Sequence, residues 1–402
     1  MKRGLAAAIM TAAICFASTA SGQQTAVKIG ILNDQSGPYA DLGGAGSIVA
    51  AQMAIEDFGG KALGKPVELT SADHQNKPDI GGAIARRWVD VENVDAIVDV
   101  PHSATAFSVL SVTQATNRML LLSGPAHTDF TGKRCAPTTI HWTYDSYAMA
   151  NGTARAMVKG GGNTWFFLTG DNAGTIALQD DAKRFVEQAG GSVLGAVRAP
   201  LNSPDFSSFL LQAQASKAKV IGLANAGADT VNSVKQAAEF NIVNQGQKLA
   251  GLLIFLSDVH GIGLKEAHGL VATEAFYWDL NDETRAWSKR FMERHKGRAP
   301  TSVQAGVYGA VLHYLKAVNA ANTKDSVAVA KKMKELRVND FFSKDVVIRE
   351  DGRVVRDMYL LEVKKPEESK YPWDYYKVMA TIPGAEAFRP MAEGGCPLVK
   401  TQ

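Results

Sequence analysis

The feature that most constrains the fold is a regular alternation of strand-like and helix-like segments along the chain. Four apolar runs of strand length, VKIGIL, PVELTSAD, AIVDV and MLLLSG, are separated by amphipathic segments such as IVAAQMAIEDF and DIGGAIARRWVDVEN. Strands that alternate with amphipathic helices are typical of a parallel sheet covered by helices. The sequence therefore predicts an α/β protein with a doubly wound parallel sheet.

The same pattern starts again after TTIHWTYDS. NTWFFLTG, SVLGAVRAP and KVIGLANA are predicted strands, with helices around QDDAKRFVEQAGG and ADTVNSVKQAAEF. A chain of 402 residues exceeds the usual length of one domain, so we expect two α/β units of similar size. Near the C-terminus, DVVIREDGRVVRDMYLLEVKK predicts a hairpin and WDYYKVMATIP a further strand.

Residues 1–22 have the pattern of a secretory signal peptide. Lys2 and Arg3 precede the apolar run LAAAIMTAAICFA and the small residues STASG, and this run is short for a membrane span. Ile14 stands before Cys15, where lipoprotein signals have a small residue, so we do not expect lipid attachment. The mature protein is expected in the periplasm. Loss of Lys2 and Arg3 takes the formal charge from +3 to +1, which does not suit a nucleic-acid binder.

Two cysteines, Cys135 and Cys396, remain after the signal. In an oxidising compartment such an isolated pair predicts a disulfide, because neither lies in a CxxC motif or a Cys/His cluster. The chain also lacks HExxH and GxSxG, so we predict no metal site, no cofactor and no catalytic residue.

The loop after the first strand, with SGPYADLGGAG, is neither a dinucleotide fingerprint nor a P-loop. Its glycines Gly44 and Gly46 come too late after the strand, Val49 replaces the third glycine, and no lysine is present. Because ligands bind at the carboxyl edge of open parallel sheets, this loop and Tyr39 are predicted to form part of a ligand mouth. A plain surface loop with an exposed tyrosine is the alternative.

Similar loops follow other predicted strands. After AIVDV, Ser103 and Ala104 open a helix whose first amides can donate hydrogen bonds to an anion. After MLLLSG, the segment GPAHTDF offers Ala126 and Thr128, and FFLTG of the second unit runs into a loop with Asn172.

SGPYADLGG, SAT and GPAHTD, in this order after these strands, resemble the leucine/isoleucine/valine-type periplasmic solute-binding proteins of ABC importers. The resemblance extends from about Val27 to the terminal hairpin. It implies two lobes joined by a three-crossing hinge, with lobe 1 at residues 26–142 and 277–345 and lobe 2 at 143–276 and 346–383. The remaining tail, 384–402, would be tied back by the disulfide. The protein would be a monomer that closes on a small ligand and delivers it to a membrane permease.

The resemblance also implies roles for individual residues. Ser103, Ala126 and Thr128 would hold the ligand carboxylate, with Tyr39 alongside. The tyrosine that such proteins place in a DxxY loop is missing from TGDNAGT, where Asn172 is a candidate for a polar role.

A second departure concerns the acid that holds the ammonium group in amino-acid binders of this family. The matching segment, AGLLIFLSD, has the apolar residues 252–255 at that place. Because desolvating an unpaired ammonium is costly, a simple α-amino acid is disfavoured.

PHSATAF, ANAGADTVNS and EAFYWDL resemble instead the branch that takes up aromatic carboxylates such as hydroxybenzoates and coumarate. Phe276 could then stack on the ring, and His102, Asn225 and Asp229 could bind ring hydroxyls.

Simpler interpretations stay open at this stage. His102 could be a surface histidine, Asp229 could cap a helix, and at least one aromatic residue of 276–278 could belong to the hinge or core. A branched-chain amino-acid or amide binder, a ligand-sensing domain of the same fold, and an exported enzyme are the alternative functions.

Overall fold

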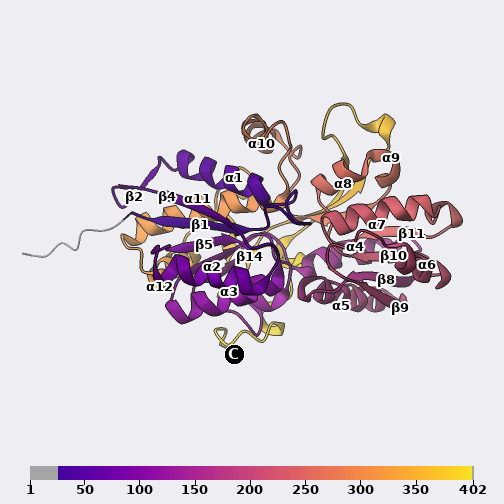
Figure 1. The fold of residues 1–402 in the computed structure, drawn as a ribbon, viewed down its shortest axis with the longest axis horizontal. Helices are drawn as coiled ribbons and strands as arrows, with labels where there is room; N and C mark the ends of the chain where they lie inside the picture. Colours follow the sequence, from indigo (N-terminus) through magenta and orange to yellow (C-terminus); the bar gives the residue numbers. More distant parts are fainter. Residues whose placement is uncertain (1–25, 401–402) are drawn as a thin grey trace, which may run out of the picture.

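The computed structural model describes residues 26–400, which form two α/β lobes that lie end to end along the long axis of the molecule (Figure 1). The predicted signal peptide, with Cys15, and the last two residues of the expected tail lie outside the described residues. The fold class predicted from the sequence is confirmed.

The first lobe is built on five parallel strands in the order β4-β1-β5-β6-β7. Its strands are β1 (Lys28–Asn33), β4 (Glu68–Asp73), β5 (Ala96–Asp99), β6 (Met119–Leu122) and β7 (Thr139–His141). Its helices are α1 (Gly44–Asp57), α2 (Pro78–Asp90) and α3 (Ser103–Thr116), joined by α10 (Asp282–Arg294), α11 (Ser302–Ala321) and α12 (Ser326–Glu335) from later in the chain. The long helix α11 packs on α1 and α12, so chain segments far apart in sequence share one core. A small hairpin, β2 (Lys61–Ala62) and β3 (Lys65–Pro66), precedes β4.

The second lobe has seven strands in the order β16-β15-β12-β11-β10-β8-β9. The parallel strands are β8 (Thr164–Gly170), β9 (Ser192–Ala199), β10 (Val220–Ala224), β11 (Lys248–Gly251) and β12 (Val271–Glu274), and the antiparallel ones are β15 (Met358–Val363) and β16 (Tyr376–Ile382). Its helices are α4 (Ser146–Lys159), α5 (Ala173–Gln188), α6 (Ser207–Ala215), α7 (Ala228–Glu239), α8 (Leu256–Ile262) and α9 (Leu264–Ala267).

Local sequence explains where the helices next to the hinge begin. Asp145 caps α4 by accepting a hydrogen bond from the Ala148 amide at 2.9 Å. Thr301 caps α11, where Gln304 donates its amide to the threonine hydroxyl at 3.3 Å. Such caps satisfy amides that have no acceptor inside the helix, so the helix starts are fixed at the residues that approach the other lobe.

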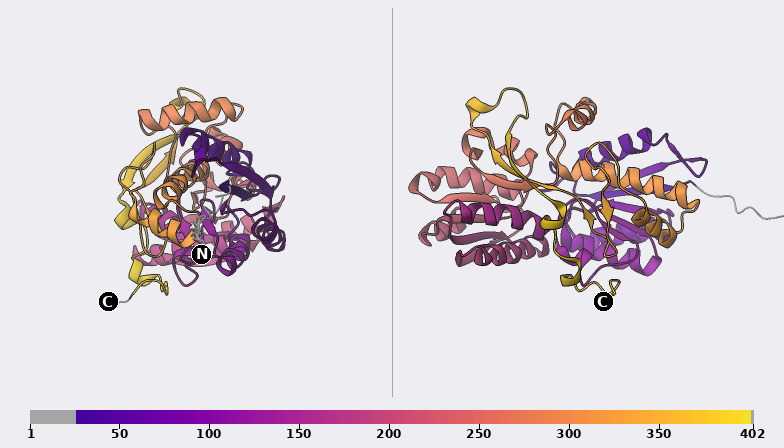
Figure 2. Two further views of the ribbon diagram at one scale, coloured as in Figure 1. Left: turned by 90° about the vertical axis from the view of Figure 1, so that its left-hand side faces the viewer. Right: turned by 180° about the vertical axis from the view of Figure 1, so that it is seen from behind.

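The chain crosses between the sheets three times, before α4, after β12 and before β15 (Figure 2). The hairpin of β13 (Val347–Ile348) and β14 (Val354–Val355) precedes the third crossing and contributes Ile348 and Val354 to the core of the first lobe. The third crossing therefore comes after β14, later than the position expected at residue 346. The reason is that the hairpin strands pair with each other, whereas only β15 joins the second sheet.

The C-terminal tail packs across both lobes. The short helix α13 (Gly384–Ala387) lies against α4, where Asn151 donates its side-chain amide to the Glu386 carbonyl at 2.8 Å. The predicted disulfide between Cys135 and Cys396 is present, with the two Cα atoms 5.7 Å apart. Among residues 26–400, none of the helices combines the length and the apolar character that a membrane crossing needs.

Candidate functional site

A small cavity lies between the two lobes at the carboxyl ends of their parallel strands. Its volume is about 20 Å³, which is room for about one water molecule. The first lobe and the first crossing contribute Tyr39, Leu42, Pro101, Ser103, Gly124, Ala126 and Tyr144, and the second lobe contributes Asn172, Gly174, Thr175, Ala226, Leu253 and Phe255. A ring-sized organic molecule is larger than this space, so it fits only when the lobes stand further apart than they do here.

The lobes touch at the rim of this cavity, so the arrangement is a closed one. The Ala228 amide at the start of α7 donates a hydrogen bond across the lobes to the Pro38 carbonyl at 3.0 Å. A Cβ atom on Gly174 would lie 2.6 Å from the Ser103 Oγ, which shows how closely the start of α5 approaches α3. In both contacts the second lobe approaches the first through its backbone, at the Ala228 amide and at Gly174, which has no side chain.

The loop after β1 is shaped by one carboxylate, which turns Tyr39 into the cavity. Asp34 accepts hydrogen bonds from the Gly37 amide at 2.8 Å and from the Tyr39 amide at 2.9 Å. Asn76 donates its side-chain amide to the same carboxylate at 2.5 Å. Tyr39 is buried, and burial raises the pKa of its phenol, so the group is a neutral hydrogen-bonding partner.

Ser103 lines the cavity as the first residue of α3, and its Oγ accepts a hydrogen bond from the His127 amide at 3.4 Å. The first amides of the helix, including those of Ser103 and Ala104, have no acceptor within the helix. Ala104 is half-buried and does not line the cavity.

His102 is buried behind this helix start and does not line the cavity. Its Nδ1 lies 2.9 Å from the Thr105 Oγ1, and its ring centroid is 6.3 Å from that of Tyr39. Burial lowers the pKa of His102 to about 4, so the ring is neutral near pH 7. The alternative of a surface histidine is wrong, because His102 is buried.

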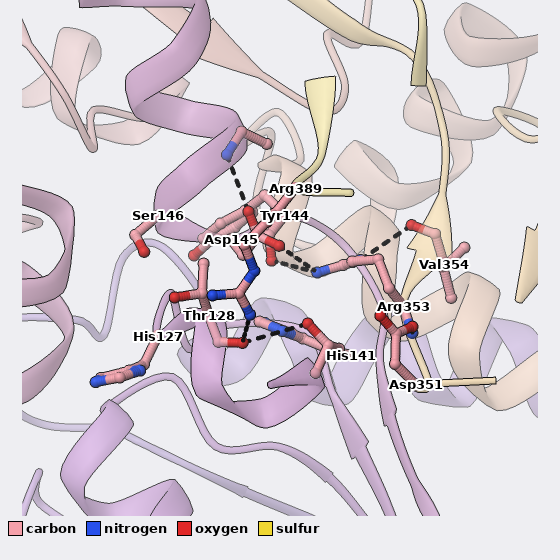
Figure 3. Close-up of polar contacts among 12 residues, drawn as sticks. His127, Thr128, His141, Tyr144, Asp145, Ser146, Asp351, Arg353, Val354 and Arg389 are labelled. Carbon is pink, nitrogen blue, oxygen red and sulfur yellow. Dashed lines mark hydrogen bonds and ion pairs between the residues drawn. The ribbon is translucent and has the colours of Figure 1, made fainter. Parts of the chain in front are cut away.

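The loop after β6 brings Ala126 to the cavity but turns Thr128 away from it. The Ala126 carbonyl accepts a hydrogen bond from the Ser146 amide at 2.6 Å. Thr128 begins a 3₁₀ turn, η1 (Thr128–Thr131), and its carbonyl accepts a hydrogen bond from Arg389 of the tail at 3.2 Å (Figure 3). Of this predicted pair, only Ala126 lines the cavity.

Asn172 is the second-lobe residue from the prediction that does line the cavity. Its Oδ1 caps α5 by accepting hydrogen bonds from the Gly174 and Thr175 amides at 3.1 and 3.2 Å. Its Nδ2 is buried and makes no close hydrogen bond among the described residues.

Asn225 and Asp229 serve the start of α7 and do not line the cavity. The Asn225 amide donates to the Ser233 Oγ at 3.1 Å and accepts from the Thr230 Oγ1 at 2.9 Å. Asp229 accepts the Asn202 amide at 3.0 Å. Burial raises the pKa of Asp229 to about 6. Asp229 does not cap the helix either, since Gly227 occupies the N-cap position.

Phe276 belongs to the core of the first lobe and does not line the cavity. Its ring makes edge-to-face contacts with Phe341 and Phe342, with centroids 5.8 and 5.5 Å apart. Tyr277 and Trp278 bind the Trp373 carbonyl through their polar atoms. All three aromatic residues therefore belong to the core or the hinge region, in line with the simpler interpretation.

Apolar side chains also line the cavity. Leu253 and Phe255 come from the segment where amino-acid binders were expected to carry an acid. Phe255 packs against Tyr144 with ring centroids 5.6 Å apart, and the Tyr144 hydroxyl donates to the Gly124 carbonyl at 2.5 Å. Sequence reasoning missed Tyr144, although its place after β7 at the same sheet edge was a usable signal.

Lining residues without a recognisable motif were also missed. Leu42, Pro101, Thr175 and Ala226 lie next to predicted residues in the loops and helix starts, but apolar or small side chains there have no chemical signature in the sequence.

A buried arginine joins two of the crossings beside the cavity (Figure 3). Arg353 is fully buried and donates hydrogen bonds to the carbonyls of Tyr144 at 2.8 Å and Val354 at 3.1 Å. Its Nη1 lies 3.6 Å from the Asp145 carboxylate. Burial lowers the pKa of Arg353 to about 9, which leaves the guanidinium charged at neutral pH. The first and third crossings are thereby held together at the hinge.

No ionisable acid or base other than the Tyr39 and Tyr144 phenols lines the described cavity. The buried Asp258 lies nearby, but its carboxylate accepts the Phe255 amide at 2.9 Å and does not line the cavity. Within residues 26–400, no cluster of His, Cys, Asp and Glu side chains could hold a metal ion. A lining that combines hydrogen-bond donors with apolar side chains suits a ligand with an anionic end and an apolar body.

Comparison with known proteins gives a consistent result over nearly the whole chain. The family model described as periplasmic binding protein matches residues 26–369. A curated relative, the Leu/Ile/Val-binding protein homolog 6 of Brucella melitensis biotype 1, is 22% identical over 378 residues, covering 90% of this chain and 94% of the relative.

Solved structures agree. A periplasmic binding protein from Burkholderia mallei is 48% identical with a TM-score of 0.91, covering 93% of this chain and 99% of the other. A branched-chain amino-acid ABC transporter periplasmic ligand-binding protein from Burkholderia xenovorans LB400 is 41% identical with a TM-score of 0.82, covering 92% and 99%. A solute-binding protein of an ABC transporter from R. palustris, in complex with benzoate, is 19% identical with a TM-score of 0.82, covering 93% and 100%, and shows likeness of fold.

Proposed function

Because the chain belongs to the periplasmic binding protein family, as an ABC-type solute-binding protein of the Leu/Ile/Val group, we propose that it captures a small aromatic carboxylate and delivers it to a membrane permease. Proteins of this family are binding proteins that serve ABC importers in the periplasm. A hydroxybenzoate or a phenylpropanoid such as coumarate is the proposed ligand. We further propose that the protein acts as a monomer.

One observation carries this proposal: the cavity combines neutral hydrogen-bond donors with apolar side chains and contains no acidic side chain. The ammonium group of an amino acid would be buried here without a carboxylate partner, which is costly. A carboxylate would instead meet the Ser103 hydroxyl and the first amides of α3, where the helix dipole favours negative charge.

The rest of the ligand would lie against the apolar side. Tyr39, Tyr144, Leu253 and Phe255 offer ring faces and aliphatic surface suited to an aromatic body. His102, Asn225, Asp229 and Phe276 lie outside the lining, so we no longer propose them as direct contacts.

Closure of the hinge is the proposed mechanism. Ligand docks first on the lobe that holds Ser103, and contacts from the second lobe then favour the closed arrangement by their differential affinity. The permease would recognise the closed form.

Branched-chain amino-acid binding is the second candidate, because the 41%-identical relative carries that description. It would require an acid to reach the ligand ammonium. Asp258, the nearest candidate by sequence, is engaged with the Phe255 amide.

A thermal-shift and calorimetric screen of the mature protein decides between the two. The panel comprises 4-hydroxybenzoate, benzoate, coumarate, leucine, valine and the matching aromatic amides. A ligand at one hundred times its dissociation constant adds about 2.7 kcal/mol of stability. Stabilisation by aromatic acids but not by leucine or valine is expected, and the reverse pattern would reject the aromatic-carboxylate proposal.

A further inference from the structure

We propose that Asn172 is the residue with which the second lobe grips the ligand carboxylate, so that one carboxylate group bridges the two lobes. The inference rests on the proposed function, since it takes the ligand to be a small organic carboxylate. It goes further by assigning the contact that makes closure depend on the anionic group.

The side-chain amide of Asn172 has its orientation fixed by the helix it caps. The Oδ1 accepts the amides of Gly174 and Thr175, so the oxygen faces α5. The Nδ2 must then point to the other side, where Asn172 lines the cavity. This nitrogen is buried and makes no close hydrogen bond among residues 26–400, although the Tyr39 hydroxyl lies within a longer hydrogen-bonding range. A buried donor without a close partner is costly, so an acceptor placed in the cavity would be stabilised.

Tyr39, which comes from the other lobe, is a polar residue of the same cavity lining as Asn172. The Asn172 amide acts to lower the pKa of the Tyr39 phenol, against the larger upward effect of burial. The two side chains line the same cavity from opposite lobes. An acceptor between the lobes is within reach of both.

Ser103 completes the arrangement from the first lobe. A Cβ atom on Gly174 would lie 2.6 Å from the Ser103 Oγ, so the start of α5 and the start of α3 meet at the cavity. A carboxylate has two oxygens and about four acceptor sites. One oxygen can be held by Ser103 and the first amides of α3, while the other accepts from Asn172 Nδ2.

This contact would exist only when the lobes are together. An open form keeps the Ser103 side of the site but moves Asn172 away, so the bond to Nδ2 contributes differential affinity for the closed form. The Asn172 Nδ2 donor also favours a carboxylate over an ammonium. A carboxylate oxygen accepts its hydrogen bond, whereas an ammonium is itself a donor.

The test replaces the donor while it preserves the helix cap. In Asn172→Asp the capping oxygen stays, because Asp is as good an N-cap as Asn, but an anion takes the place of the Nδ2 donor. The probes are 4-hydroxybenzoate, or the tightest aromatic acid of the screen, and the corresponding neutral amide. We expect the dissociation constant of the acid to rise at least a hundredfold and that of the amide to change less than threefold.

Asn281 provides a matched control. It caps α10 in the same way, with its Oδ1 accepting the Thr284 amide at 2.9 Å, and it does not line the cavity. Asn281→Asp should leave the affinity for the acid unchanged. Small-angle scattering adds a structural readout: the acid should compact the wild type and the Asn281→Asp variant, whereas Asn172→Asp should stay extended.

The outcomes separate this inference from the function on which it rests. If the wild type binds no aromatic acid, the proposed function fails and takes the inference with it. If the wild type binds the acid but Asn172→Asp binds it within threefold, or loses acid and amide equally, only the inference is overturned. Should Asn172→Asp not fold, Asn172→Ser keeps a capping hydroxyl with a shorter reach and should weaken acid binding about tenfold; an unchanged affinity in that variant would also reject the inference.

Discussion

Replacing both Cys135 and Cys396 by Ser should destabilise the protein without moving its ligand site. The disulfide joins positions 261 residues apart. In the chain-entropy model, closing a loop of n residues lowers the entropy of the unfolded chain by about 2.1 + 1.5R ln n cal/mol/K. For a loop of this length, that corresponds to about 5.6 kcal/mol at 25 °C. Measured values for disulfides are commonly about 2–4 kcal/mol, so we expect a loss of about 2 to 5.6 kcal/mol.

The tail should nevertheless stay in place, because other contacts hold it. Asn151 binds the Glu386 carbonyl, and Arg389 binds the Thr128 carbonyl. The loss would therefore come from the unfolded chain rather than from a rearranged native state, and the dissociation constant for an aromatic acid should change less than twofold.

Urea denaturation of the wild type and the double variant, each with and without reductant, measures the effect. Reduced wild type should behave like the double variant, and reductant should not affect the variant. A loss below about 1 kcal/mol would refute the entropy argument. A more than tenfold loss of affinity at unchanged stability would show instead that the disulfide acts on the native site.

Three further predictions concern the site and the hinge. Ser103→Ala should weaken binding of an aromatic acid about tenfold or more, as expected for a hydrogen bond to a charged group, and Thr128→Ala should weaken it much less; equal effects in calorimetry would contradict the geometry. Leu253→Glu should lower the stability of the unliganded protein because it buries an unpaired carboxylate, and leucine should restore the thermal midpoint more than 4-hydroxybenzoate does. Burial raises the pKa of Glu274 from 4.5 to about 8, so the folded state binds a proton that the unfolded state releases, and stability from this group falls as the pH rises from about 4.5 to about 8. Urea denaturation at pH 5 and pH 8 should show that the free energy of unfolding falls less in Glu274→Gln than in the wild type. An equal fall in both proteins would mean that another group causes it.

The sequence was sufficient to predict the fold and the edge of the sheets where the cavity lies. Strand and helix periodicity are local properties, and the carboxyl-edge rule follows from the topology alone. The same reasoning predicts Tyr39, Ser103, Ala126 and Asn172 at the ligand mouth, and all four line the cavity. It also identified the apolar segment that contains Leu253 and Phe255.

Two of the residues that were placed wrongly are held by contacts from distant parts of the chain, whereas His102 and Asn225 bond to neighbours within their own helix starts. Phe276 packs on Phe341 and Phe342, more than sixty positions later in the sequence. Thr128 is engaged by Arg389, which a disulfide-tethered tail brings alongside. Loop residues next to a correct position can thus face away from the cavity, and no local pattern reveals this.

Closure itself has the weakest signature in the sequence. Gly174 and Gly227 both stand in polar loops that look like ordinary helix starts, yet in the structure each meets the opposite lobe. A side chain on Gly174 would press on Ser103, and one on Gly227 would clash with the Pro38 carbonyl. The absence of a Cβ atom therefore matters where the two lobes approach each other, and only the assembled fold defines those places. Because these contacts involve backbone atoms, they set how closely the two lobes approach each other. The preference for one ligand over another therefore depends on the side chains that line the space between the lobes.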